Sequence, residues 1–71
     1  MYEISKALGE DDFENHCLQP SDGGQYSAEN AIKILENGYG GSIQHAETGR
    51  GFVVSPNKAS NAWLRKELKI K

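Results

Sequence analysis

The feature that most constrains the fold is the stretch ILENGYGGSIQHAETGRGF, residues 34–52, which holds five of the chain's eight glycines. Apolar residues recur at helical spacing before it, and a strand-like pattern follows within it. A loop that cradles phosphate needs the opposite order, with a strand leading into glycines that open a helix. Here the glycines follow a helix, whose C-terminal end carries partial negative charge and repels phosphate. The stretch is therefore predicted to connect a helix to a β-hairpin.

The segment SAENAIKILENG, residues 27–38, predicts that helix. Ser27 is suited to the N-cap position, and Gly38 is suited to a left-handed position after the last turn. Glu29 and Lys33 are four residues apart in the order that favours an ion pair along a helix. The residues expected on its buried face are Ala28, Ala31, Ile32 and Leu35.

Residues 42–55 predict the β-hairpin, because GSIQHAE alternates, ETGRG is typical of a turn and GFVVS is rich in strand-forming residues. Ser55 followed by Pro56 then predicts the N-cap and first residue of a second helix, which extends to about Leu68. Trp63 lies on the apolar stripe of this helix and is expected to be buried. The final ELKIK alternates, so a short closing strand is the alternative for the tail.

The N-terminal segment YEISKAL is compatible with a strand or with a helical turn. The following DDFENHCLQP predicts a helix that Asp11 or Asp12 caps and that ends before Pro20. Cys17 lies four residues after Phe13 and is expected in the core. Residues 1–71 are thus interpreted as a single α+β domain, with a small antiparallel sheet or hairpin packed on two or three short helices. The lean core, 37% hydrophobic overall, leaves homo-oligomerisation open.

The sequence favours a cytoplasmic protein. A single cysteine allows no intrachain disulfide, which small extracellular domains usually need. No apolar run approaches the roughly 20 residues of a membrane span. The start MYEISKALGEDD is acidic where a signal peptide is apolar.

Charge is divided unevenly along the chain, whose net charge is −2. Residues 1–36 carry eight acidic residues and two lysines, while residues 37–71 carry six basic and two acidic residues. This pattern predicts a molecule with one acidic and one basic end if the halves stay apart, and mutual neutralisation if they pack together.

No pattern in the chain predicts catalysis, a metal or a cofactor. Cys17 and His45 are the one pair suited to nucleophilic chemistry, and no motif supplies an orienting group or an oxyanion hole. Two histidines and one cysteine also lack the spacing of zinc ligands. We therefore expect a non-enzymatic protein.

Two sets of charged residues are candidates for partner binding. An acidic stretch suits a basic protein surface, and an arginine between two glycines at the hairpin tip suits carboxylates or phosphates. These candidates are Glu10, Asp11, Asp12, Glu14 and Arg50. The alternative is a small nucleic-acid-binding regulator, with Trp63 as a stacking platform and a basic set of residues, although a pI of about 5.6 is low for that class. The basic set is Arg50, Arg65, Lys66, Lys69 and Lys71.

The order of helix and hairpin, SAENAIKILENG followed by GSIQHAETGRGFVV, resembles that of small single-domain proteins of phages and mobile elements. Within that group the chain is most similar to the anti-CRISPR inhibitors of type I systems, which share its small size. The resemblance covers about half of the chain and transfers no binding residue. It implies binding to a large nucleoprotein effector, with obstruction of its nucleic-acid channel or of nuclease recruitment.

Overall fold

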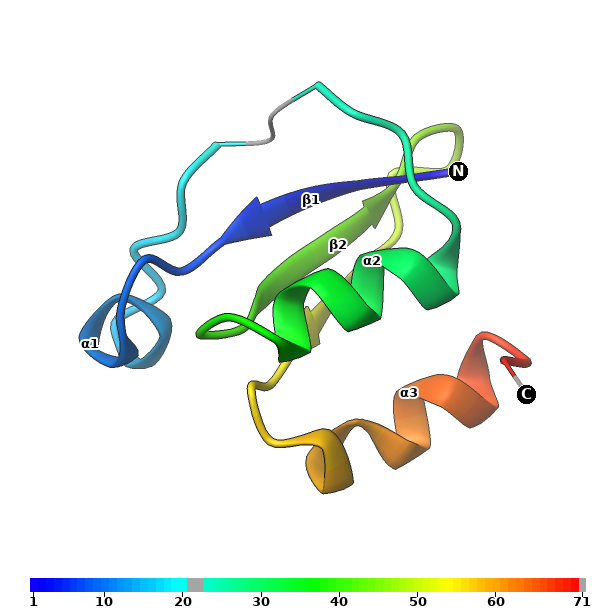
Figure 1. Ribbon diagram of the computed structural model, residues 1–71. Coiled ribbons are helices and arrows are strands. Elements are labelled where there is room, and N and C mark those ends of the chain that lie inside the picture. The colour runs from blue at the N-terminus through cyan, green and yellow to red at the C-terminus, as the bar shows by residue number, and fades with distance from the viewer. Residues whose placement is uncertain (21–22, 71) are drawn as a thin grey trace.

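The computed structural model describes residues 1–20 and 23–70. Within them, three antiparallel strands form a sheet in the order β1-β2-β3, with helices packed on one face and at one end (Figure 1). The elements in chain order are β1 (Tyr2–Lys6), α1 (Glu10–Glu14), α2 (Ala28–Glu36), β2 (Gly41–His45), β3 (Gly51–Val54), the 3-10 helix η1 (Lys58–Asn61) and α3 (Ala62–Glu67). The predicted α+β class is confirmed. The radius of gyration, 11.0 Å, matches the roughly 11 Å expected for one folded unit of this length.

The two faces of the sheet differ in polarity. The register aligns Ile4 with Ile43 and Ile43 with Phe52, so these three side chains share the face that α2 covers. The fully buried core also draws on α2 and α3; its members are Ile4, Ala31, Ile32, Leu35, Ile43, Val54 and Leu64. The opposite face carries mainly small and polar side chains. This division fixes the register, because a slip of one residue would move the isoleucines into water.

Helix α2 forms as predicted. The hydroxyl of Ser27 accepts a hydrogen bond from the backbone N–H of Asn30 at 3.3 Å. Of the expected apolar face, Ala31, Ile32 and Leu35 are buried and Ala28 is half-buried. The prediction for Gly38 is wrong, since the left-handed residue of this connection is Gly40, with φ 83°. A Cβ atom at Gly40 would lie 2.7 Å from both the Pro56 side chain and the Val54 carbonyl oxygen. The connection therefore needs glycine where the chain comes close to Val54, the last residue of β3, and to Pro56.

The N-terminal segment is a strand, and the helix after it is shorter than predicted. Helix α1 begins after Gly9, with no side-chain cap, rather than after Asp11 or Asp12. It ends at Glu14, and His16 takes a left-handed conformation with φ 57°. Cys17 therefore leaves the helical spacing and is exposed, so its expected place in the core is wrong.

The C-terminal helix starts later and faces another way than predicted. Asn57, rather than Ser55, caps η1 by accepting a hydrogen bond from the Ala59 N–H at 3.0 Å. A 3-10 helix has fewer residues per turn than an α-helix, so each residue is rotated further about the helix axis. This rotation changes which side chains face the core. Leu64 is buried and Trp63 is 55% exposed, so the expected burial of Trp63 is wrong. The chain is helical to Glu67, which excludes a closing strand up to residue 70.

Candidate functional site

An acidic surface lies at one end of the sheet, where β1 ends and β2 begins, and α1 forms it (Figure 1). Phe13, on the inner side of α1, packs at the close approach between Gly40 and Pro56 and so holds the helix against the sheet's end. The other residues of α1 are its four acids, which we call the α1 acids. They are Glu10, Asp11, Asp12 and Glu14.

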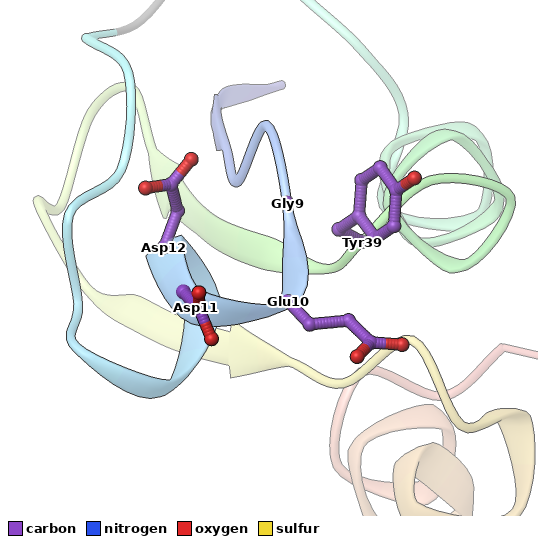
Figure 2. A pocket seen from close by; sticks show the side chains of 5 residues that line it. All are labelled: Gly9, Glu10, Asp11, Asp12 and Tyr39. Atoms are coloured by element: carbon purple, nitrogen blue, oxygen red, sulfur yellow. The ribbon is translucent and has the colours of Figure 1, made fainter.

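Tyr39 lies next to the α1 acids and is 48% exposed. Together with Gly9, Glu10, Asp11 and Asp12 it lines an open depression of about 490 Å³. Figure 2 shows the three carboxylates pointing in different directions from the helix, with the Tyr39 ring beside the chain at Gly9. The arrangement offers an aromatic ring and several carboxylate acceptors, which together suit lysine or arginine side chains.

Among residues 1–20 and 23–70, no ion pair involves the α1 acids. The ion pairs of this part of the chain join Lys33 to Glu29, Arg50 to Glu67 and Arg65 to Glu36. The positive end of the helix dipole gives Glu10, Asp11 and Asp12 only partial compensation, since they occupy the first turn of α1. Their negative charge is therefore directed at solvent and at any basic partner.

A second depression lies on the other side of α1, toward the end of β3. It has a volume of about 380 Å³ and is lined by Glu10, Phe13, Glu14, Tyr39, Ser55 and Pro56. Glu10 and Tyr39 contribute to both depressions, whereas Glu14 contributes only to the second. The α1 acids thus line two separate depressions, one on each side of the helix.

Arg50 does not lie with the α1 acids. It precedes β3 in the hairpin turn, at the opposite end of the sheet. Its guanidinium binds the Glu67 carboxylate at 3.0 Å and lies over the Phe52 ring, 5.1 Å from the ring centre. A partner that touched both Arg50 and the α1 acids would have to span the length of the sheet.

The alternative basic set is only partly available for nucleic acid. Arg65 is bound to Glu36 and Arg50 to Glu67, whereas Lys66 and Lys69 are exposed. Lys71 lies outside the described residues. Trp63 is exposed and packs on Phe52, with ring centroids 6.3 Å apart.

A buried polar cluster, which the sequence patterns did not predict, joins α2 to the C-terminal helices. Glu36 is the last residue of α2, and its side chain is only 2% exposed. Its carboxylate accepts hydrogen bonds from Arg65, at 2.6 Å to Oε2, and from the Asn61 side-chain amide at 2.9 Å. Asn61 also donates to the Ser55 carbonyl at 2.8 Å and accepts from the Ser55 N–H at 2.9 Å. These partners are 25 and 29 residues from Glu36 in sequence, so no local spacing reveals the cluster.

The cluster determines the ionisation of Glu36. Burial acts to raise the pKa of Glu36, but hydrogen bonds from Arg65 and Asn61, with the positive charges of Arg65 and Lys58, lower it below its ordinary value of 4.5. The carboxylate is thus ionised and satisfied at neutral pH. The cluster links the end of α2 to η1 and α3 through these hydrogen bonds.

The one pair of residues considered for nucleophilic chemistry, Cys17 and His45, is separated in the fold. His45 lies at the end of β2 opposite α1, and its Nδ1 accepts hydrogen bonds from the Glu47 and Thr48 N–H groups. Cys17 follows α1 at the other end of the sheet, so this pair is not brought together. In the part of the chain that the structure describes, no group of three potential metal ligands occurs, and no helix is long and apolar enough to cross a membrane.

Comparison of the chain with models of protein families, with curated proteins and with solved structures gave no match.

Proposed function

We propose that this chain is a non-enzymatic binding domain that occupies a basic surface of a larger protein or nucleoprotein. The observation that carries the proposal is the unpaired charge of the α1 acids beside the exposed Tyr39. Isolated surface carboxylates contribute little to the fold, and those of α1 repel one another. Their clustering is instead suited to electrostatic steering toward a positive partner.

In its more specific form, the proposal makes the chain a cytoplasmic inhibitor encoded by a phage or mobile element and directed at a host defence complex. A groove that binds nucleic acid is lined with lysine and arginine, and α1 would present carboxylates where phosphates otherwise bind. This form rests on the resemblance in size and in helix–hairpin order and on the charge of α1. Nucleic-acid binding through Lys66 and Lys69 is the competing outcome.

The test is affinity capture from a lysate of the source organism, with and without nuclease, followed by kinetics on the purified partner. The key variant is Asp11→Lys/Asp12→Lys, which reverses charge in the depression beside Tyr39. The matched control, Glu29→Lys/Glu47→Lys, changes the net charge by the same amount at exposed positions outside α1.

The expected result is a protein partner that survives nuclease treatment and that the control variant still binds. The key variant should slow association by about tenfold or more at low salt, an effect that shrinks as salt rises. Equal association by the two variants would exclude α1 as the contact surface. Capture of nucleic acid, with all protein lost on digestion, would favour the competing function.

A further inference from the structure

The outer edge of β3 is an unprotected sheet edge. Only β2 pairs with β3 among the described residues, so no strand lies along the other side of β3. Exposed edges are normally blunted by lysine, proline or a covering segment. The strand GFVV has neither residue, and Val53 is 52% exposed. The other edge strand, β1, is partly covered, because Tyr2 exchanges two backbone hydrogen bonds with Tyr26 and the Lys6 carbonyl accepts one from Gln19.

The register identifies which backbone groups of β3 point outward. The His45 N–H donates to the Arg50 carbonyl at 2.8 Å, which makes 45 and 50 a hydrogen-bonded pair. Hydrogen-bonded and non-bonded pairs alternate in an antiparallel ladder, so Phe52 and Val54 bond to β2. The N–H and C=O groups of Gly51 and Val53 therefore face away from the sheet. Two donors and two acceptors lie in line for another strand.

The charges near the two ends of β3 differ in net sign, although Glu47 lies in the hairpin turn and Lys58 follows Pro56 at the other end. Arg50 precedes the strand, and its contact with Glu67 brings the end of α3, with Lys66 and Lys69, to the same end. At the other end, Ser55 and Pro56 share a depression with Glu10 and Glu14.

We propose that β3 pairs antiparallel with β3 of a second copy of this chain, forming a continuous six-stranded sheet across a two-fold axis. An antiparallel copy places the basic end of one β3 beside the acidic end of the other, at both ends of the interface. The outward groups match in a register centred on Phe52, where Gly51 faces Val53 of the second copy. The exposed Val53 side chain then meets a residue with no side chain, and Phe52 meets its own copy beside Trp63.

The expected dimer is weak and depends on salt. A standard interface buries roughly 800 Å² on each partner, which is about a sixth of the 4630 Å² that one chain exposes. A four-residue strand does not reach that area alone, so Trp63 and the charged ends must contribute. We expect an interface at the small end of the range for stable complexes and a dissociation constant on the order of micromolar.

Sedimentation velocity over micromolar to millimolar concentrations tests the proposal. Val53→Pro removes an outward N–H and no bond to β2, and proline is tolerated on an open edge. It deletes two inter-chain hydrogen bonds by symmetry, so dimerisation should weaken by about tenfold or more. Val53→Thr keeps the N–H and the strand preference and should leave the dissociation constant within about threefold. Circular dichroism of each variant verifies that it is folded.

Charge swaps provide a second readout that does not depend on Val53. Arg50→Glu and Glu14→Arg should each weaken the dimer, and the double variant should restore it, because the ends remain opposite in sign. A chain that stays monomeric at millimolar concentration would overturn the proposal, as would a dimer that Val53→Pro and both single swaps leave unchanged. The dimer interface does not include Asp11 or Asp12. The test of dimerisation and the test of partner binding can therefore give different outcomes.

Discussion

Removing Arg65 should destabilise the fold strongly, because it leaves the buried Glu36 carboxylate without its cation. Loss of one partner from a buried ion pair costs about 3–5 kcal/mol. The Arg65 side chain is 32% exposed, and Asn61 would still donate to Glu36, so we expect about 2–3 kcal/mol for Arg65→Met. A core of this size supplies roughly 3–5 kcal/mol in total. The variant should therefore lose about half of its stability or more.

Urea unfolding followed by far-ultraviolet circular dichroism measures this cost, since Trp63 is exposed and reports weakly on folding. The matched control is Glu36→Gln/Arg65→Met, which removes both charges and keeps an acceptor for Asn61. It should recover at least about 1 kcal/mol of what Arg65→Met loses, because no buried charge is left unpaired. An Arg65→Met cost below about 1 kcal/mol, or strict additivity of Glu36→Gln and Arg65→Met, would show that the ion pair does not hold the buried carboxylate in place.

The same cluster predicts a pH dependence with a definite sign. Because the pKa of Glu36 in the folded chain lies below its ordinary value of 4.5, its contribution is full above about pH 4.5. It is lost as the pH falls through the folded-state pKa. The stability difference between the wild type and Glu36→Gln should therefore be constant at higher pH and shrink in acid. A difference that grows below pH 4.5 would contradict the assigned direction.

Three further predictions follow from local geometry. In urea unfolding, Gly40→Ala should lower the free energy of unfolding by about 1–3 kcal/mol more than Gly23→Ala does. Both glycines have positive φ, but of the two only Gly40 has atoms close to the position of an added Cβ. Equal losses for the two variants would contradict this. Ser27→Ala should cost about 1 kcal/mol in the same assay through loss of the α2 cap, and an unchanged midpoint would show that the cap contributes nothing. Iodide should quench Trp63 efficiently in dilute native protein, since the side chain is 55% exposed; a protected, blue-shifted emission would place it in an interface.

The sequence predicted those elements that local patterns determine. The α2 face, its Ser27 cap and the hairpin after it follow from spacing of apolar residues and from the turn-forming ETGRG. The order of helix, glycines and strand also predicts the connection between these elements. The α1 acids were identified by composition alone, and the structure adds Tyr39 beside them.

The wrong predictions for Cys17 and Trp63 share a cause, since each depends on a local change in backbone conformation that the spacing of apolar residues does not reveal. A left-handed residue, His16, ends the helical path before Cys17, and the 3-10 turn of η1 rotates Trp63 out of the core. The Glu36 cluster and the open β3 edge depend on contacts between distant segments. Such tertiary features follow from topology, so periodicity within one segment does not predict them.

Whether the acidic end of the sheet is the binding surface can be decided by the rate at which the captured partner associates with Asp11→Lys/Asp12→Lys and with Glu29→Lys/Glu47→Lys, at low and at high salt. We expect only the first variant to associate more slowly than the unmodified chain, by about tenfold or more at low salt, and the difference in rate to narrow at high salt. Equal rates for the two variants at every salt concentration would show that the acidic end of the sheet is not the binding surface.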